Sequence, residues 1–482
     1  MKINIKLLVL IILVLAEVGC TKDFKEMNTN PNTLVTVPYK TLITNSEISI
    51  ANTYNPILGG GVAGWARYNV RDVYVQGDQY QITGSLTDFN VYSGHLENLK
   101  KALQLAEAAG DDNSVAVIKI LTSYAFQNMT DWYGDIPYSQ ALKADDPAGS
   151  SIYPKYDSQQ SIYLDLIAQL KAANALIKSS GNIGSADVIF NGNMMMWKRF
   201  CNSLLLRIYM RMSLVDAATA KSGIETIASD PNTYPVINSN ANAAFKYWIP
   251  GDATYRSPYW MNPVTAGLQQ SVTSAFMIGF LKDRSDARLP VYAEPAASSG
   301  QYVGLPLGTL GQSTPNLSIM GVKEFRSENS PTRIMRYSEV LFIYAEAALN
   351  GWNVGMTAKQ AYDAAVTASF QEYGLAIGNY LSNPMVNFNG GTNQRQLIGD
   401  QKWCALYPDG NQGWAEVRRT GFPTYVATTE PVGTMYPGKG LIRRMPYPYS
   451  EGISNPEGLA GAKVAQPKIV NEIFGGVWWD VK

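Results

Sequence analysis

The sequence predicts a mostly α-helical protein built from helix hairpins, with one long loop-rich insertion. Apolar residues recur at alternating steps of three and four in paired segments, and turns or loops containing Gly, Asn or Asp separate the members of each pair. Alanines cluster at 345–348 and 361–365, where paired helices would approach closely. These features indicate a tetratricopeptide-like array, although the spacing departs from that repeat's regular period of about 34 residues.

The elements follow from the same periodicity along the chain. In the first hairpin, Leu96 and Leu103 lie on one face of a helix, a turn follows at 110–112, and Val117 and Tyr124 lie on one face of the next helix. The other hairpins repeat this pattern. The four expected hairpins are 89–106 with 117–132, 157–178 with 193–214, 337–350 with 357–372, and 393–406 with 411–419.

Two segments lack helical periodicity, residues 230–331 and residues 422–482, and both are rich in Pro, Gly and Tyr. Loops this long in a compact protein usually carry function, so the ligand region is expected at about 230–331. After Cys20 no Ser/Gly linker or block of charge divides the chain. Residues 20–482 are therefore expected to form a single domain.

The amino terminus has the pattern of a cleaved targeting segment. Lys2 and Lys6 precede an apolar run over residues 7–16, too short to cross a bilayer core as a helix, which needs about 20 residues. Residues 1–19 are therefore predicted to be a signal peptide, and Cys20 resembles the acylated cysteine of bacterial lipoproteins. Glu17 stands where such signals usually carry Leu, which leaves an ordinary secretory signal as the alternative. Acylation of Cys20 would tether the protein to a membrane surface.

The composition excludes several classes of function. Lys and Arg number 39, as do Asp and Glu, so the chain lacks the basic excess of a nucleic-acid-binding protein. His95 is the only histidine, which excludes sites with several histidines. Cys201 and Cys404 form either one long-loop disulfide or two buried thiols, and buried thiols are favoured because free cysteine packs as a small core residue. No cofactor is predicted, although carboxylates and carbonyls in the loops could coordinate a structural calcium ion.

Aromatic residues suggest where a ligand binds. Charged residues make up only 16% of the chain, which contains 29 Tyr and 10 Trp. Such rings stack on the apolar faces of sugars, while Arg, Asp and Asn hydrogen-bond to hydroxyl groups. Two clusters outside the helical periodicity combine these residue types, and each could instead pack loops onto the helices. The first cluster, after a glycine run at 59–61, comprises Trp65, Arg67, Tyr68, Arg71, Asp72, Tyr74 and Tyr80. The second comprises Tyr247, Trp248, Tyr255, Arg256, Tyr259 and Trp260.

Two further motifs have both a functional and a structural interpretation. Residues 132–138 combine aromatic residues, Asp and Gly as a sugar site would, but Gly134 and Pro137 favour a helix stop. Glu339 and Glu346 lie two turns apart on a predicted helix and could form the carboxylate pair of a glycosidase. Ion pairing with arginine is the favoured interpretation of these two carboxylates.

Seven local segments are spread over almost the whole chain after Cys20. They are 23–32, 132–138, 197–207, 286–290, 336–347, 416–421 and 443–448, the third of which reads WKRFCNSLLLR. In this order they resemble the SusD/RagB group of outer-membrane nutrient-binding lipoproteins. The resemblance implies a SusD-like α-α superhelix of four tetratricopeptide-like units, with a loop-rich ligand face and no catalytic activity. It also implies a cell-surface lipoprotein that sits on a SusC-like, TonB-dependent β-barrel transporter and delivers oligosaccharides, or in some members peptides, for import.

The expected function is therefore capture of an oligosaccharide at the outer membrane by a lipid-anchored protein that serves a transporter. A peptide ligand in the same role is the nearest alternative. Two alternatives belong to other classes: a secreted glycosidase, in which two carboxyl groups carry out catalysis, and a tetratricopeptide scaffold that binds only proteins.

Overall fold

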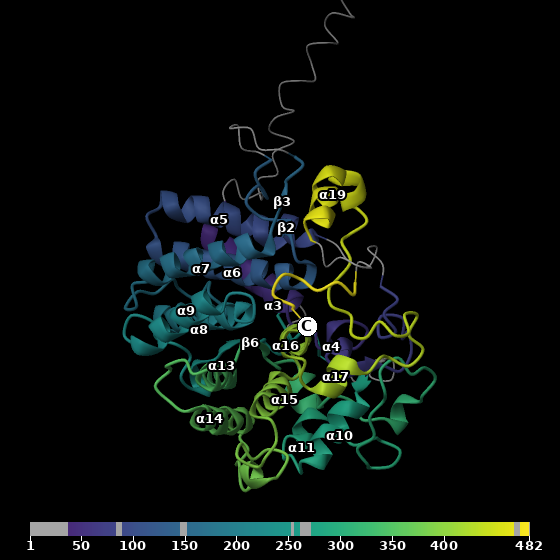
Figure 1. Cartoon of the computed structure of the whole chain (residues 1–482). Helices are drawn as coiled ribbons and strands as arrows, with labels where there is room; N and C mark the ends of the chain where they lie inside the picture. Colours follow the sequence, from purple (N-terminus) through teal and green to yellow (C-terminus); the bar gives the residue numbers. More distant parts are fainter. Residues whose placement is uncertain are drawn as a thin grey trace, which may run out of the picture.

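The computed structural model describes residues 37–82, 89–144, 152–251, 255–260, 271–466 and 473–481. The expected signal peptide, Cys20 and the segment 23–32 lie outside these described residues. In Figure 1, helices stack in layers down one side of the molecule, from α5 at the top to α14 near the bottom. Shorter helices and long connections form the other side, where α10, α11 and α17 lie. The mostly α-helical fold class is confirmed.

All four predicted hairpins are present. Their helices are α5 (Glu97–Ala108) with α6 (Asp112–Tyr133), α7 (Gln159–Leu176) with α8 (Met194–Met212), α13 (Tyr337–Leu349) with α14 (Ala358–Gln371), and α15 (Gln394–Leu406) with α16 (Gly410–Thr420). Side chains cap several of them: Asp111 accepts the Ser114 N–H at 3.1 Å, and Thr357 and Gln360 form a reciprocal capping box. Because α6 packs on α7, α8 on α13 and α13 on α15, neighbouring hairpins share a core.

Two further helices extend the array. Helix α3 (Tyr39–Thr53) packs against α5, and α9 (Ala217–Ser229) packs against α8. Helix α3 has no clear apolar stripe in the sequence, because it buries the polar side chains of Ser46 and Glu47. Helix α9 buries Ala220, Ile224 and Ile227 at helical spacing, but most of its other residues are Ala, Ser and Thr. The expected start of the first hairpin is a π-helical turn, η1 (Tyr92–Leu96), directly before α5.

Short β-strands and short helices connect the loop-rich side to the stacked helices. Within the described residues, β-structure consists of three antiparallel pairs: β1 (Asn69–Arg71) with β5 (Ser271–Thr273), β2 (Ile136–Pro137) with β3 (Tyr156–Asp157), and β4 (Ala244–Lys246) with β6 (Thr332–Met335). Asn69 is opposite Thr273 and Arg71 is opposite Ser271, so the first aromatic cluster is joined to the insertion. The remaining helices are α4 (Val62–Trp65), η2 (Asn240–Asn242), α10 (Ala275–Asp283), α11 (Leu289–Tyr292), η4 (Thr314–Asn316), α12 (Val322–Phe325), η5 (Tyr380–Ser382), α17 (Thr424–Thr428), α18 (Glu451–Ser454) and α19 (Pro456–Ala465).

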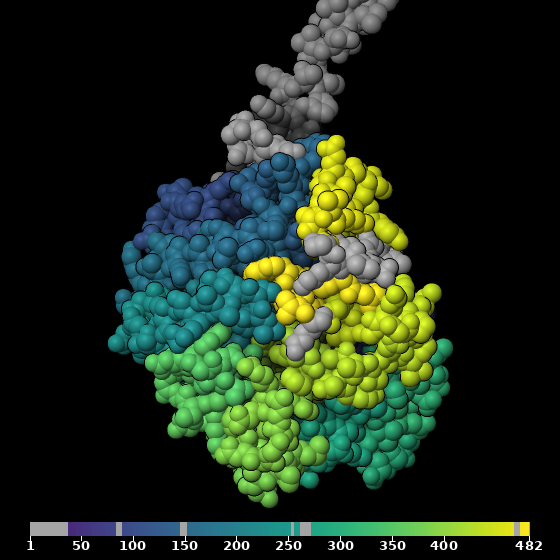
Figure 2. Space-filling view, viewed as in Figure 1, coloured from purple at the N-terminus to yellow at the C-terminus, as the bar shows by residue number. Residues whose placement is uncertain are grey.

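The apolar residues form separate cores under the two sides. The larger core lies between the stacked helices, and a second core under the loop-rich side is built largely from aromatic rings such as Trp403, Trp414 and Tyr407. In Figure 2, the segments that carry α10, α15 and α17 meet at the lower right of the visible face. No helix in the described ranges combines the length and the apolar character needed to span a membrane.

Two structural interpretations are confirmed. Cys201 and Cys404 are buried free thiols rather than a disulfide, and burial raises the pKa of the Cys404 thiol to about 12. The 132–138 segment ends a helix: Gly134 takes a φ of 79° after α6 and its N–H donates to the Thr130 carbonyl at 2.8 Å. Pro137 then lies in β2, where its segment pairs with β3 instead of continuing the helix.

The single histidine is a core residue. His95 is buried, with Nδ1 3.1 Å from the Ser49 hydroxyl and Nε2 3.0 Å from the Tyr54 hydroxyl. Burial disfavours the charged ring and lowers the pKa of His95 from 6.5 to about 4. His95 therefore packs as a neutral ring that is hydrogen-bonded on both sides.

This burial predicts a dependence of stability on pH. Since the pKa of His95 is lowered on folding, its stabilising contribution is present above pH 6.5 and is lost as the pH falls toward 4, by up to about 3 kcal/mol. A His95→Gln variant should lack this acid-dependent loss when the free energies of unfolding at pH 7 and pH 4.5 are compared. The one histidine ring signal in an NMR titration should remain that of the neutral ring at pH 5. Titration of that signal near pH 6.5 would contradict the assignment.

Candidate functional site

The carboxylates that suggested a glycosidase belong to a buried ion-pair network. Glu339 accepts two hydrogen bonds from Arg207, from Nε at 2.6 Å and from Nη2 at 2.8 Å, and both side chains are buried. Burial alone would raise the pKa of Glu339, but the adjacent Arg207 charge outweighs it and lowers this pKa. Arg336, which precedes Glu339 in the sequence, pairs with Glu372 instead.

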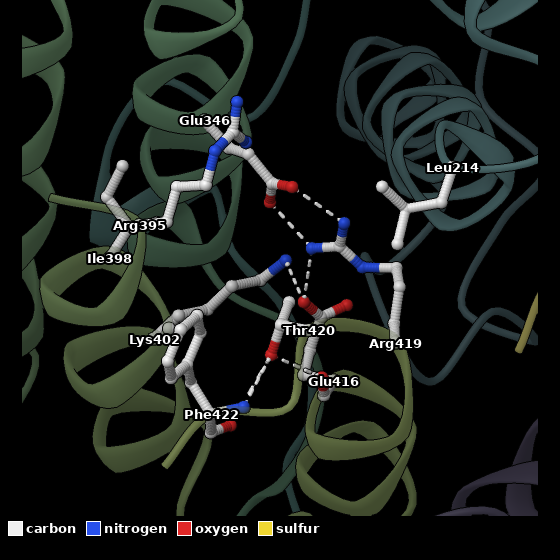
Figure 3. Close-up of a pocket in the computed structure, with 10 residues that line it drawn as sticks. Leu214, Glu346, Arg395, Ile398, Lys402, Glu416, Arg419, Thr420 and Phe422 are labelled. Carbon is white, nitrogen blue, oxygen red and sulfur yellow. Dashed lines mark hydrogen bonds and ion pairs between the residues drawn. The ribbon is translucent and has the colours of Figure 1, made fainter. Parts of the chain in front are cut away.

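Glu346 belongs to a second part of the network, which Figure 3 shows. Arg419 donates from Nη1 and Nη2 to the two oxygens of Glu346 at 2.7 and 2.6 Å, and Nη2 also reaches Glu416 at 2.8 Å. Lys402 Nζ lies 3.0 Å from Glu416. The cavity beside these groups measures ≈ 70 Å³, far below the roughly 300–1,000 Å³ of small-molecule pockets.

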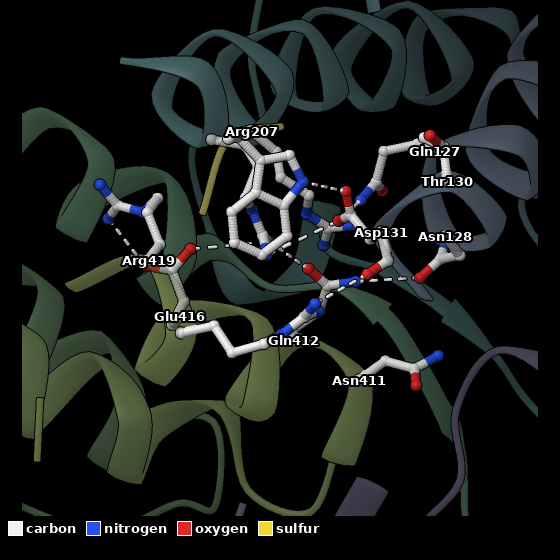
Figure 4. Close-up of polar contacts among 12 residues, drawn as sticks. Gln127, Asn128, Thr130, Asp131, Arg207, Asn411, Gln412, Glu416 and Arg419 are labelled. Carbon is white, nitrogen blue, oxygen red and sulfur yellow. Dashed lines mark hydrogen bonds and ion pairs between the residues drawn. The ribbon is translucent and has the colours of Figure 1, made fainter. Parts of the chain in front are cut away.

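Helices from distant parts of the chain meet at Asp131 in the same network (Figure 4). Asp131 accepts hydrogen bonds from Tyr163, Trp479 and Gln127. The Arg211 guanidinium lies 3.6 Å from Asp131 and the same distance from Glu416. These contacts join α6, α7, α8 and α16 to the carboxyl-terminal segment, so this network is part of the protein core.

The network has the geometry of structural ion pairing and not of catalysis. A glycosidase needs one carboxyl group with a raised pKa and a second carboxylate beside an accessible bond. Here Glu339 and Glu346 each pair with an arginine in the interior. Burial alone would raise the pKa of Glu416, but the charges of nearby arginines and Lys402 outweigh burial and hold this pKa well below its ordinary value. The ion-pair interpretation of Glu339 and Glu346 is confirmed, with Arg207 and Arg419 as their partners.

Most of the first aromatic cluster packs inside the protein. Trp65 meets Trp414 edge-on with ring centres 5.1 Å apart, and Tyr68 donates to the Trp403 carbonyl. These rings fill the space between α4 and α16, which leaves them no surface for a ligand. The structure therefore corrects the ligand-contact prediction for the buried members, which are Trp65, Arg67, Tyr68, Asp72 and Tyr80.

Two members of the first cluster keep some exposure. Arg71 is half-buried and donates from Nε to the Gly59 carbonyl at 2.9 Å, so part of its hydrogen-bonding capacity is used within the loop. Tyr74 is 71% exposed and stays a candidate ligand contact.

The second cluster is divided between packing and surface positions. Trp248 is buried and donates from Nε1 to the Thr332 hydroxyl at 3.0 Å, so its predicted ligand contact is corrected as well. Tyr259 is half-buried and donates to the Asn55 carbonyl at 2.7 Å, which fixes its loop to the end of α3. Both rings thus hold the insertion against the helices.

The remaining members form an amphipathic surface. Tyr247 and Tyr255 are 62% and 41% exposed. The Arg256 guanidinium lies 4.1 Å from the centre of the half-buried Trp260 ring, and its Nη1 is 3.9 Å from Glu328 Oε1. We call Tyr255, Arg256, Trp260 and Glu328 the Trp260 surface. It offers aromatic faces beside a guanidinium and a carboxylate, the combination that contacts sugar rings and hydroxyls.

Sequence reasoning missed Glu328, because it lies far from Trp260 in the chain and no local motif marks it. The fold brings it to the loop, where it also accepts the Gly251 N–H at 2.8 Å. In the described ranges, no group of three or more His, Cys, Asp or Glu side chains is arranged to hold a metal ion.

The protein is a stacked-helix scaffold with a buried ion-pair network in its core and exposed aromatic residues on its loops, as expected of a helical ligand-binding protein. A family model described as "Starch-binding associating with outer membrane" matches residues 31–448. The chain therefore belongs to the SusD-like family. No individually curated protein matches the chain.

Solved structures show the same fold. A SusD homologue from Bacteroides fragilis is 23% identical, with a TM-score of 0.78 over 92% of this chain and 99% of that one. A SusD homologue from Bacteroides uniformis is 25% identical, with a TM-score of 0.76 over 92% and 98%. A chitin-binding SusD homologue from Flavobacterium johnsoniae is 23% identical, with a TM-score of 0.75 over 91% and 99%.

Proposed function

We propose that this protein is a lipid-anchored, surface-exposed lipoprotein of the outer membrane that binds an oligosaccharide and passes it to a TonB-dependent barrel transporter. Family membership supports the association with the outer membrane and the carbohydrate ligand. The chitin-binding relative supports a glycan as the ligand class. Cys20, preceded by a signal-like segment, is the proposed site of acylation.

The observation that carries the proposal is the chemistry of the Trp260 surface. Its exposed rings offer apolar faces for sugar stacking, and its one guanidinium is balanced by Glu328. A peptide ligand would present charged termini or side chains, and an already neutralised surface has little charge to attract them. The surface therefore favours a neutral glycan over a peptide.

The proposed role is non-catalytic. The paired carboxylates of α13 and α16 are buried against arginines, so they support the fold and do not face a substrate. A binding protein that only delivers its ligand has no need of an activated carboxyl group.

Co-purification tests the partnership and the anchor together. Native membranes would be solubilised gently, the protein captured, and its companions and its own amino terminus identified by mass spectrometry. We expect a TonB-dependent barrel at near-equal amount and an acylated Cys20. Recovery of the protein alone from the soluble fraction, with an unmodified Cys20, would contradict both the anchor and the transporter partnership.

A further inference from the structure

A separate hollow lies where α10, α15 and α17 meet. Its volume is ≈ 430 Å³, within the range of small-molecule sites. Figure 2 shows that the segments carrying these three helices come together on one face of the molecule. The hollow shares no residue with the Trp260 surface. Its lining is Ala275, Phe276, Gly279, Phe280, Asp283, Arg284, Met385, Gln396, Asp400, Pro423, Thr424 and Tyr425.

One part of the lining is an aromatic wall. Phe276 and Tyr425 stack in parallel, with ring centres 4.7 Å apart and an angle of 6° between their planes. Phe276 also packs against the buried Trp403, which fixes the stack to the core. Tyr425 nevertheless remains 48% exposed. A rigid, half-exposed aromatic stack is the kind of surface on which the apolar face of a sugar ring packs.

The other part of the lining is a polar pair that is incompletely hydrogen-bonded. Arg284 Nη2 lies 3.8 Å from Asp400 Oδ2, beyond hydrogen-bond distance and unlike the 2.6–2.8 Å contacts between Arg207 and Glu339. Asp400 is 5% exposed, yet its Oδ1 has no hydrogen-bond partner, and neither has Arg284 Nε. Leaving such buried groups unpaired costs free energy that a further hydrogen bond to the pair would recover.

The fold holds this pair in place. The Arg284 guanidinium lies 3.7 Å from the centre of the Phe280 ring, and its Nη1 donates to the Phe280 carbonyl at 3.2 Å. A Cβ at Gly399, beside Asp400, would lie 2.6 Å from Phe422 Cβ, so glycine at this position allows α15 to approach the segment that leads to Tyr425. The aromatic wall and the polar pair are thus positioned before any ligand arrives.

The charges indicate a neutral ligand. Asp283 and Asp400 outnumber Arg284, which disfavours phosphate and other anions. Burial raises the pKa of Asp400 to about 6, so at pH 7.5 its carboxylate accepts hydrogen bonds from a hydroxyl.

We propose that this hollow is a second carbohydrate-binding site, in which one sugar ring packs on the Phe276–Tyr425 stack and its hydroxyls bond to Arg284 and Asp400. The inference rests on the proposed glycan-binding function and adds a site separate from the Trp260 surface. A long oligosaccharide, or two short ones, would then be held at two places on one protein.

The test is isothermal titration calorimetry at pH 7.5 with maltoheptaose, cellohexaose, xylohexaose and chitohexaose on the purified protein and its variants. Tyr425→Ala removes an exposed ring and should leave thermal unfolding unchanged, while Asp400→Asn keeps the side-chain shape and removes the charge. For any oligosaccharide that the parent binds, Tyr425→Ala should weaken the affinity at least fivefold or abolish one of two binding events. Asp400→Asn should also weaken the affinity for that oligosaccharide. Tyr449→Ala, which removes a 64% exposed ring outside the hollow, is the matched control.

The outcomes separate the two proposals. If the parent binds an oligosaccharide but Tyr425→Ala binds it within twofold of the parent, the second site is wrong and the proposed function stands. If the parent binds none of the four probes, the glycan-binding proposal fails and the inference fails with it.

Discussion

Replacing Arg419 by methionine is expected to lower the free energy of unfolding by about 3–5 kcal/mol. Arg419 is fully buried and holds Glu346 with two hydrogen bonds and Glu416 with a third. Methionine removes the guanidinium and leaves Glu346 in the interior without its hydrogen-bonded ion-pair partner. Denaturant unfolding followed by circular dichroism measures the change, and the same scans show whether the variant folds at all.

Two variants make this experiment decisive. Lys359→Met removes an exposed cation that pairs with Asp363 one helical turn away, and it should change stability by less than about 0.5 kcal/mol. Arg419→Met combined with Glu346→Leu should recover part of the loss, because Glu416 keeps Lys402 as a partner. A loss below about 1 kcal/mol for Arg419→Met alone would show that the network does not stabilise the fold.

Trp260→Ala is expected to weaken oligosaccharide binding at least tenfold, which corresponds to about 1.4 kcal/mol, with thermal unfolding nearly unchanged. The ring is half-buried and packs on Arg256, so truncation removes both the stacking face and the support of the guanidinium. Calorimetric titration with the best-binding probe gives the affinity, and the melting temperature checks the fold.

The exposed ring of Tyr449 again provides the control, since its loss should leave affinity unchanged. Arg256→Lys keeps the charge but loses the planar guanidinium, so it should weaken binding less than Trp260→Ala. Equal affinity of Trp260→Ala and the parent would remove the Trp260 surface from the proposed ligand contacts.

The sequence predicts helices where apolar residues recur at helical spacing between turn residues. In α6, Val117, Ile120 and Tyr124 face the core, and Asp111 caps the start. Helix α3 was not predicted, because its buried face includes the polar residues Ser46 and Glu47 and is therefore not uniformly apolar. Periodicity finds a helix only when the buried side is also the apolar side.

The candidate ligand residues were harder to predict for a related reason. An aromatic residue in a loop has no periodic neighbours that reveal which side it faces, and Tyr and Trp are common both in cores and at binding surfaces. Tyr68 and Tyr74 stand six positions apart, yet Tyr68 is buried beside Trp403 and Tyr74 is exposed. Phe276 was missed because residues 230–331 were expected to lack helices, whereas it lies in α10.

The sequence by itself determined the four hairpins, the buried state of the two thiols, the helix stop at Gly134 and the pairing of the α13 carboxylates with arginine. The periodicity of apolar residues and the backbone preference of glycine act within a few residues of the chain. The high free-energy cost of burying an unpaired charge applies in any fold. Only the tertiary structure decided which arginines pair with Glu339 and Glu346, which loop aromatics reach the surface, and which side chains line the hollow beside Tyr425. These depend on contacts between segments hundreds of residues apart, such as Trp132 with Asn411, and side-chain partners at that distance follow from how the chain packs.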